Sequence, residues 1–390
     1  MEWNWQQPDW PRFSWSKDRL ARAEERFLLG GGVIVGAVSH LDAERRDRLA
    51  VDAMVEEAVT SAEIEGEILN RDSVQSSIRR QLGLATDSRR AAPAERGIAE
   101  MMVDLYRKFE VPLDGQTLCA WHAMLMHGRR DLSDIGHYRT HAESTRVVSG
   151  KVCDPHVHFE APTSARVPEE MRAFLQWFNE TSPSGSRPLP ALTRAGTAHL
   201  YFESIHPFED GNGRIGRAIC EKALAQSLGM PMLTGLAAAM LARRRSYYNM
   251  LEASNKGCEV TEWLAWFAAV ALEAQQRTQT HVDFLIDKTR LLDRLRDVLN
   301  ERQMAVLLRT LREGPRGFQG GLSAGNYVSI AKTSPATARR DLADLVGKGA
   351  FTRTGERRHA RYHLIIPLRP VSPVTIDETG NLVSTTRTDE

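Results

Sequence analysis

A twelve-residue run, HPFEDGNGRIGR from His206 to Arg217, constrains the fold more than any other part of this chain. Residues 192–205 precede it and have an apolar face that predicts an inward-facing helix. His206-Pro207 ends that helix, because a proline disfavours helical backbone at the residue before it. A second helix is expected to begin only after Gly213. The run is therefore predicted to be a short loop fixed between two helices.

The glycines and arginines of this run are suited to binding phosphate. Gly211 and Gly213 permit backbone conformations closed to other residues, so successive N–H groups can point into one concavity at the positive end of the second helix. Arg214 and Arg217 lie three residues apart on one helix face. Both guanidinium groups can therefore reach the same anion.

Two further side chains of the run can supply catalysis. Asp210 offers a hard oxygen ligand for a Mg²⁺ ion that bridges phosphates. His206 has an imidazole that can take a proton from an incoming hydroxyl. Each residue alone has an ordinary role in a cap, a turn or a surface ion pair. Their combination within twelve residues predicts a site for a nucleoside triphosphate beside a catalytic base.

Residues 211–216 also spell GxGxxG, the fingerprint of dinucleotide-binding domains. That fingerprint requires a hydrophobic strand before it and an acidic residue about twenty positions later. A helix and the polar segment HPFED precede the glycines here. The dinucleotide interpretation is therefore rejected.

The run resembles the Fic family motif, His-x-Phe-x-Asp/Glu-Gly-Asn-Gly-Arg-x-x-Arg, at every fixed position. The matching residues are His206, Phe208, Asp210, Gly211, Asn212, Gly213, Arg214 and Arg217. The resemblance implies transfer of AMP from ATP to a Ser, Thr or Tyr hydroxyl of an unidentified target protein or of the enzyme itself, with pyrophosphate leaving. It also implies Mg²⁺ as cofactor, with Mn²⁺ as a substitute. One subgroup has lysine at the second motif glycine and phosphorylates instead, and Gly213 argues against that activity.

The same resemblance implies a role for individual residues. His206 is the base, Phe208 packs the loop and Asp210 holds Mg²⁺. Asn212 contacts the α-phosphate and Arg214 holds the outer phosphates. The implied nucleotide-binding residues are Gly211, Asn212, Gly213, Arg214, Ile215, Gly216, Arg217, Tyr247, Tyr248 and Asn255. The last three match family positions that contact the base and sugar, and the alternative for them is a helix face with packed tyrosines.

An inhibitory segment is expected upstream of the motif. Apolar residues from Val51 follow the spacing of an amphipathic helix that runs to about Ile64. At its end, Ser61, Glu65 and Gly66 fit the family's inhibitory pattern of Ser or Thr, three residues, Glu, then Gly or Asn. By this resemblance Glu65 pairs with Arg217 and takes the place of the γ-phosphate. Glu65 could instead orient a water that removes AMP from a modified target.

The predicted fold class is mainly α, a Fic-type helical core with one β-hairpin. Helices are expected near 98–109, 116–126 and 168–178, and β-branched residues around Ser149-Gly150 predict a hairpin over 146–159. This hairpin and Gly136-His137-Tyr138-Arg139 occupy the place of the family's flap, which aligns a target by strand pairing. The expected domains are 1–95, an arm with Trp3, Trp5, Trp10 and Trp15 plus the inhibitory helix; 96–280, the catalytic core; 281–370, a winged helix-turn-helix; and 371–390, a polar tail.

The segment from Leu285 to Pro370 carries 17 Lys and Arg against 8 Asp and Glu, a net +9 in a chain of net +1. Three expected helices followed by two strands there resemble a winged helix-turn-helix. Basic residues on the third helix and the wing favour a second hypothesis, a DNA-binding regulator whose Fic core senses nucleotides. These residues are Arg339, Arg340, Arg353, Arg357, Arg358 and Arg361. The alternative is a protein contact, including a homodimer.

No stretch approaches the roughly 18 uncharged apolar residues of a membrane span, and the first residues lack a signal-peptide pattern. We therefore expect a cytoplasmic protein without membrane contact. The cysteines, Cys119, Cys153, Cys220 and Cys258, are too far apart for a paired metal motif and are expected to be idle thiols. A third hypothesis is transfer of another group from a different diphosphate-containing donor, because the motif binds phosphates and says little about the base.

Overall fold

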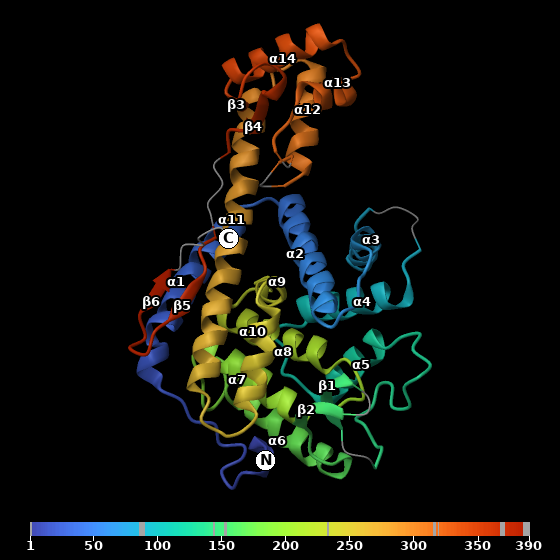
Figure 1. Cartoon of the computed structure of the whole chain (residues 1–390), viewed down its shortest axis with the longest axis vertical. Coiled ribbons are helices and arrows are strands. Elements are labelled where there is room, and N and C mark those ends of the chain that lie inside the picture. Colours follow the sequence, from blue (N-terminus) through green and yellow to red (C-terminus); the bar gives the residue numbers. More distant parts are fainter. Residues whose placement is uncertain are drawn as a thin grey trace. The chain divides into compact units, whose positions relative to one another are not determined.

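The computed structural model describes residues 2–85, 90–142, 145–151, 154–231, 234–314, 317–318, 320–366 and 371–384. The chain forms two compact units, Met1–Gln276 with Ser372–Glu390 and Arg277–Val371 (Figure 1). Helices predominate in both units, which confirms the predicted fold class. None of the helices in the described segments combines the length and apolar character that crossing a membrane requires.

The first unit is built from helices, with two short hairpins. Its helical elements are η1 (Asn4–Gln6), α1 (Lys17–Ser39), α2 (Ala43–Ile64), α3 (Arg71–Gln81), α4 (Pro93–Arg107), α5 (Gly115–Leu125), η2 (Ser164–Arg166), α6 (Val167–Glu180), α7 (Ala191–Ile205), α8 (Asn212–Leu228), α9 (Leu236–Leu241), α10 (Arg244–Ser254) and the first part of α11 (Thr261–Leu295). The helices expected within 51–64, 98–109, 116–126, 168–178 and 192–205 are all present.

The helix pair α7 and α8 occupies the centre of this unit. Almost every residue of α7 is buried, which explains why its sequence is apolar or small around most of its circumference. At Gly196, a β-carbon would come within 3.1 Å of Leu264 and Phe267 side-chain atoms, so α11 packs directly on the backbone of α7. The loop between α7 and α8 is thereby fixed at both ends, as expected.

Helix α8 begins earlier than the sequence indicates. Its first residue is Asn212, and Gly211 is the N-cap with a left-handed backbone, φ 81°. Gly213 therefore lies in the first turn of α8 instead of ahead of it. A glycine weakens a helix interior more than a helix start, where the N–H groups have no partner inside the helix.

Helix α1 is absent from the helices predicted above. Three consecutive glycines, Gly30 to Gly32, lower its intrinsic helix propensity. Tertiary contacts with α7 and α8 compensate, because a β-carbon at Gly31 would overlap the side chain of Leu228. The glycines allow a close helix approach that periodicity does not reveal.

The tryptophan-rich arm is anchored on the body, as expected. Trp3 is buried, and the indole N–H of Trp5 donates to the carbonyl of Glu160 at 2.7 Å. The indole of Trp10 donates to Glu170 Oε2 at 2.9 Å. These contacts hold the arm against the predicted flap and α6.

The hairpin expected over 146–159 is confirmed as β1 (Arg146–Lys151) and β2 (Asp154–Glu160), paired antiparallel with Arg146 opposite Glu160. Cys153 lies outside the described residues. The role of this hairpin as a flap for a target segment stays a prediction.

The second unit contains the rest of α11, then α12 (Glu301–Arg312), α13 (Ala324–Ala331), α14 (Pro335–Gly347), β3 (Phe351–Thr354), η3 (Arg357–His359) and β4 (Arg361–Leu364). Ser334 caps α14 by accepting from Thr337 N–H at 3.2 Å. Strands β3 and β4 pair antiparallel, with Phe351 opposite Leu364. Three helices and a hairpin thus follow in the expected order, and the winged helix-turn-helix assignment stays a prediction.

The prediction of a polar tail over 371–390 is wrong for most of its length. Strands β5 (Val374–Ile376) and β6 (Leu382–Ser384) pair antiparallel, and β5 packs in the core of the first unit. Val374 and Ile376 are two residues apart, so both side chains share one face of the strand. The strands of this hairpin are only three residues long and are flanked by polar turn residues, so the sequence does not predict them. Residues 385–390 lie outside the described segments.

Candidate active site

His206 ends α7 in a left-handed conformation, φ 51° and ψ 60°, which is unusual for a residue with a side chain. Arg139 supports it from the protein interior. The Nε of Arg139 donates to the His206 carbonyl at 2.8 Å, and the Arg139 N–H donates to the Pro207 carbonyl at 2.9 Å. Arg139 is only 2% exposed. Its remaining donors bind Ser164 Oγ at 2.9 Å and the Pro162 carbonyl, so the guanidinium ties three segments together.

Burial, followed by the positive charge of Arg139, lowers the pKa of His206 to about 4. The imidazole is therefore neutral at pH 7 and can accept a proton. Glu203 Oε2 lies 3.8 Å from His206 Nδ1. Burial, followed by the charge of Glu65, raises the pKa of Glu203 to about 8, so its carboxyl is protonated at pH 7. Glu203 is missing from the sequence prediction, although its i, i+3 spacing from His206 on one helix was the available signal.

Asn212 braces the loop through its side chain. Its Oδ1 accepts from the Phe208 N–H at 3.0 Å, and its Nδ2 donates to the Phe208 carbonyl at 2.8 Å. The Phe208 ring is buried and stacks on His122 with ring centroids 4.3 Å apart, which confirms that Phe208 packs the loop. A contact of Asn212 with an α-phosphate would therefore come from its main-chain N–H.

Main-chain N–H groups at the start of α8 have no partner inside the helix, an arrangement that suits an anion. The first helical hydrogen bond runs from the Ile215 N–H to the Gly211 carbonyl at 3.0 Å, so the N–H groups of 212–214 lie ahead of it. Ile215 is fully buried, and a β-carbon at Gly216 would lie 2.7 Å from Glu203 Oε1. The structure places these two residues in the packing of α8 on α7.

Asp210 lies beside this helix start and pairs with two arginines, Arg129 Nη1 at 2.7 Å and Arg214 Nη2 at 3.3 Å. Burial opposes ionisation, but the hydrogen bond from Arg129 and the charge of Arg214 hold the pKa of Asp210 below its ordinary value. The side chain is a 37%-exposed carboxylate beside the first turn of α8. It fits a Mg²⁺ ion that takes one carboxylate and substrate phosphates as ligands. Arg129 has no motif that could have predicted it.

Glu65 reaches the other end of the motif. Its Oε1 accepts from Arg217 Nη2 at 2.8 Å. Arg217 is 1% exposed and also donates from Nε to Ser61 Oγ at 2.9 Å and from Nη2 to the Ser61 carbonyl at 2.8 Å. Burial disfavours the guanidinium charge, but the attraction of Glu65, together with Tyr247 and Glu203, raises the pKa of Arg217. The structure thus brings Ser61, Glu65 and Arg217 together, as predicted.

Two glycines make this approach possible. Gly66 has a left-handed backbone, φ 86°, directly after the end of α2, a conformation that glycine adopts without strain. At Gly213, a β-carbon would overlap Glu65 Oε1 and lie 3.1 Å from Arg217 Nη1. The missing side chain at position 213 therefore leaves the volume that the carboxylate fills.

The segment from Ser61 to Glu67 makes further contacts that the sequence pattern does not contain. Glu67 Oε2 lies 2.6 Å from Arg214 Nη1, so both motif arginines pair with carboxylates of the same segment. The Tyr248 hydroxyl donates to the Ile64 carbonyl at 3.1 Å and lies 3.5 Å from Glu65 Oε2. Glu67 follows the pattern by one residue, so only a search for neighbouring acids could have found it.

Helix α2 is also anchored to α9 by Glu57, one turn before Ser61. Glu57 accepts from the Ala237 N–H at 3.1 Å, at the start of α9. Glu57, Ser61 and Glu65 are spaced four residues apart and share a face of α2. Burial, followed by the charge of Glu221, raises the pKa of Glu57. A buried glutamate at this position looks like a surface charge in the sequence.

Tyr247 and Asn255 are engaged in packing. Tyr247 is 1% exposed, and its hydroxyl lies 2.7 Å from His199 Nε2. Asn255 is 6% exposed and accepts from Ser204 Oγ at 3.4 Å. Tyr248 is 39% exposed and borders Glu65. Nucleotide contacts by these three residues stay predictions, with Tyr248 the most accessible of them.

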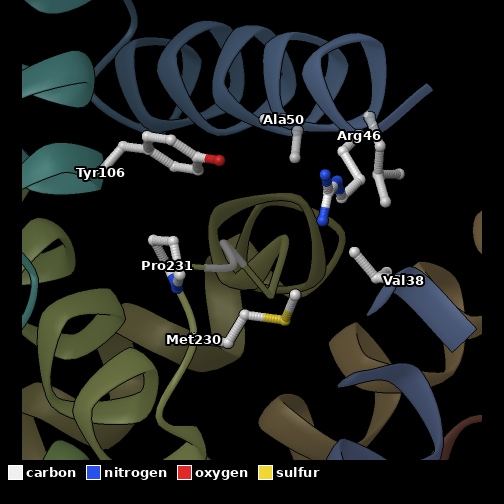
Figure 2. A pocket seen from close by; sticks show the side chains of 8 residues that line it. Val38, Arg46, Ala50, Tyr106, Met230 and Pro231 are labelled. Atoms are coloured by element: carbon white, nitrogen blue, oxygen red, sulfur yellow. The ribbon is translucent and has the colours of Figure 1, made fainter. Parts of the chain in front are cut away.

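A separate pocket lies on α2, away from Glu65 (Figure 2). Figure 2 shows Tyr106, Ala50, Arg46 and Val38 around it, with Met230 and Pro231 opposite α2. Leu49 and Ala53 complete the lining. None of the residues that line this mostly apolar pocket belongs to the motif from His206 to Arg217.

Comparison with known families agrees with this geometry. Residues 112–224 match the Fic/DOC family. The chain carries a Fic/DOC family domain. This domain contains α5, the β1–β2 hairpin, α6, α7 and most of α8, with the motif between the last two helices. Residues 3–84, which include the arm and α2, match a domain of unknown function, DUF4172.

Curated relatives resemble the Fic/DOC domain region. A probable protein adenylyltransferase of Aquifex aeolicus is 28% identical over 102 residues, 26% of this chain and 28% of the relative. The protein adenylyltransferase fic-1 of Caenorhabditis elegans is 27% identical over 136 residues, 34% of this chain and 25% of the relative. The matches therefore span about a quarter of each relative.

The fold has a counterpart among solved structures. A Fic family protein from Desulfovibrio desulfuricans G20 superimposes with a TM-score of 0.51 and 21% identity. The match covers 91% of this chain and 98% of that chain. The likeness supports a shared fold over most of the length.

Proposed function

We propose that this protein is an autoinhibited protein adenylyltransferase, which moves AMP from ATP onto a Ser, Thr or Tyr hydroxyl. The observation that carries the proposal is a single twelve-residue motif with a neutral His206 at one end and Arg217, paired with Glu65, at the other. The adenylyltransferase names of the two relatives support the same reaction class.

In the proposed reaction the target hydroxyl oxygen attacks the α-phosphorus of ATP. His206 accepts the hydroxyl proton, a P–O bond to the target forms, and the bond to the β-phosphate bridging oxygen breaks. Pyrophosphate leaves with the electron pair of the broken bond. The main-chain N–H groups at the start of α8 stabilise charge on the phosphates. Asp210 would hold Mg²⁺, which neutralises phosphate charge when bound.

Autoinhibition follows from competition for one cation. Arg217 is buried and binds a carboxylate oxygen of Glu65 at 2.8 Å. A γ-phosphate that is held by the same guanidinium would displace that carboxylate, since two anions cannot share this space without strong repulsion. The protein is therefore inactive while Glu65 stays in place.

Labelling with ATP that is radioactive at the α-phosphate tests this proposal. The wild-type chain, Glu65→Gly, and Glu65→Gly with His206→Ala are each incubated with a cell lysate and Mg²⁺ or Mn²⁺. Label should appear on protein with Glu65→Gly and disappear with the added His206→Ala. Glu63→Gly is the matched control, because Glu63 is exposed on the same turn. Absence of label with Glu65→Gly at every metal concentration would refute AMP transfer.

Mass spectrometry of the labelled protein identifies the transferred group and its acceptor residue. A mass other than AMP would point to another diphosphate-containing donor. The reverse reaction, in which Glu65 orients a water that removes AMP, is tested by adding purified modified target to the wild-type chain. Free AMP released by wild type and not by Glu65→Gly would establish that direction.

A second candidate function, DNA binding, rests on the second unit. Arg339 and Arg340 on α14 and Arg353 and Arg357 near the β3–β4 turn are exposed. Arg361 is partly buried, and the Arg358 side chain lies outside the described residues. Exposed arginines on a helix and an adjacent hairpin suit phosphate contacts with a duplex.

Fluorescence anisotropy of the full chain with a labelled duplex tests DNA binding. The affinity should fall with salt, and Arg339→Gln with Arg340→Gln should reduce the logarithmic salt slope by about 2. Arg296→Gln, which changes an exposed arginine just after the end of α11, is the control. Binding without salt dependence, or an unchanged slope, would contradict this function and favour a protein contact such as a homodimer.

A further inference from the structure

A second cluster of candidate ligands lies outside the motif, between the β1–β2 hairpin and α10. His156 and His158 are two residues apart on β2, so their side chains project from the same face of the strand. Glu252 lies on α10, almost a hundred residues later. The fold therefore brings together three ligand-type side chains that have no motif spacing in the sequence.

The three side chains converge on one point. His158 Nδ1 lies 2.6 Å from Glu252 Oε2, and His156 Nε2 lies 3.3 Å from Glu252 Oε1. The two imidazole rings are 4.4 Å apart at an interplanar angle of 80°. All three ligand atoms lie within 4.8 Å of one another. Ligands of a tetrahedral zinc ion, each about 2.0 to 2.1 Å from the metal, are separated by roughly 3.3 Å, so small rotamer changes would complete the geometry.

The donor set selects the type of ion. Two imidazole nitrogens and one carboxylate oxygen are common zinc ligands, and imidazole favours late transition metals over Mg²⁺. The His156 side chain is 63% exposed, whereas those of His158 and Glu252 are 31% and 32% exposed. The cluster is thus supported from the protein side and open to water on the other, which leaves a fourth ligand position to solvent.

We propose that His156, His158 and Glu252 bind one divalent transition-metal ion, with Zn²⁺ as the first candidate, which fastens the β1–β2 hairpin to α10. This site is separate from Asp210, a carboxylate that would hold a hard ion together with substrate phosphates. It does not depend on the proposed AMP transfer, because its ligands lie outside the motif.

The consequence of metal binding is mechanical. The hairpin is a two-stranded ribbon, and a ribbon of two strands has little independent stability. Metal bonds from β2 to α10 would restrict its movement against the helix that carries Tyr248, the neighbour of Glu65. The ion would therefore order the surface at which strand pairing with a target is expected.

Cobalt titration of the untagged full chain tests the site. The chain is first stripped of metal with a chelator, and Co²⁺ is then followed by its visible absorption, which intensifies when the ion enters a four- or five-coordinate nitrogen-containing site. We expect one intense Co²⁺ site per chain that Zn²⁺ displaces. His158→Gln and Glu252→Gln should each weaken binding by at least about 10- to 100-fold.

Two control variants separate this site from others. His40→Gln removes an exposed histidine on the C-cap of α1, and Asp210→Asn removes the candidate Mg²⁺ ligand; both should retain the intense Co²⁺ site. Circular dichroism verifies that each variant is folded. Hydrogen exchange of the β2 amides should slow when Zn²⁺ is added to wild type, but not to His158→Gln.

The proposal is overturned if folded His158→Gln and Glu252→Gln bind Co²⁺ as tightly as wild type, or if Asp210→Asn alone abolishes the signal. It is also overturned if wild type shows no intense Co²⁺ absorption, in which case the cluster is an ion pair of Glu252 with two histidines and nothing more.

Discussion

The two halves of the motif are held in different ways. His206 to Asn212 is fixed by bonds to main-chain groups, through Arg139 and through the amide of Asn212. Arg214 and Arg217 are held by carboxylates of the inhibitory segment, at 2.6 Å and 2.8 Å. The first set of contacts is compatible with a bound nucleotide, whereas the second occupies the groups that would bind its phosphates.

One half of the motif holds the conformation of His206, whereas the other half holds arginines whose partners can be exchanged. A base in a left-handed conformation requires supports that remain in every state of the protein. An arginine paired with a carboxylate can exchange that partner for a phosphate, because both are anions with oxygen acceptors. Variants that disturb the contacts of His206 to Asn212 should therefore lower the free energy of unfolding and the rate of AMP transfer. Variants of the carboxylates that pair with Arg214 and Arg217 should change the affinity for nucleotide.

The largest effect is expected from Arg139→Met. This change removes the donors that reach the carbonyls of His206 and Pro162 and leaves these groups buried without partners. The free energy of unfolding should fall by about 3 kcal/mol, measured by urea denaturation. AMP transfer in the Glu65→Gly background should fall at least about 100-fold, because the base is displaced.

Arg130→Met is the matched control for that variant, since Arg130 is exposed in the neighbouring loop. Normal stability and transfer of Arg139→Met would show that the left-handed conformation of His206 is held by other contacts. The proposed difference between a fixed His206 and arginines with exchangeable partners would then not hold.

The next largest effect is expected from Glu65→Gln in a His206→Ala background, in which turnover is blocked. Loss of the carboxylate frees Arg217, and calorimetry should show ATP binding about 10- to 100-fold more tightly. Glu63→Gln should leave the affinity unchanged. Equal affinities for Glu65→Gln and its parent would indicate that ATP and Glu65 do not compete.

A smaller effect is expected from Glu67→Gln. Its partner Arg214 is buried, but the Glu67 side chain is 38% exposed, so solvent screens much of the attraction. The ATP affinity should rise by no more than about 5-fold. Because both carboxylates are displaced by the same phosphates, the double variant Glu65→Gln with Glu67→Gln should differ from the sum of the single changes in free energy. Strict additivity would show that the two pairs act independently.

The smallest effect is expected in the pH profile. His206 has a pKa of about 4, so it is deprotonated and competent above pH 5, and transfer is lost only as the pH falls through about 4. Glu203 has a pKa of about 8 and acquires its charge as the pH rises through that value. The charge of Glu65 contributes to that pKa, so in Glu65→Gly the step lies below 8.

Rates of Glu65→Gly measured between about pH 3.5 and 9 should therefore fall through an acid limb at about pH 4 or below. Above it they should contain one step of about 2-fold, as a nearby negative charge changes the basicity of His206. Adding Glu203→Gln should remove this step and leave the acid limb in place. An acid limb near 6.5 would show that His206 is not buried as the structure describes.

The sequence was sufficient to predict the parts of the candidate site whose residues are close together in the chain. The loop, the positions of His206 and the two arginines, and the pairing of Glu65 with Arg217 could be predicted, because twelve residues and one short upstream pattern contain them. Arg139 could be named only as part of Gly136-His137-Tyr138-Arg139. Its contacts with the carbonyls of the loop depend on tertiary packing.

Other features left weak signals or none. The glycines in α1 and the polar turn beside β5 gave no sequence signal for a helix or a strand. Tertiary contacts form both elements there, because they outweigh the local propensity. Asn212 was expected at a phosphate, but its amide closes the loop. The cluster of His156, His158 and Glu252 joins a strand to a distant helix, and no spacing rule could have joined them.

Because it contains the β5–β6 hairpin, the first unit can be completed only after the second unit has been synthesised. The chain leaves this unit after Gln276 and re-enters it at Ser372, where Val374 and Ile376 join its core. During synthesis at roughly 5 to 20 residues per second, the intervening segment takes on the order of 10 s to emerge. Throughout that interval the core of the nascent first unit lacks Val374 and Ile376. A stop codon after the second unit would make that loss permanent, whereas an internal deletion of 277–371 with a short linker would preserve the hairpin.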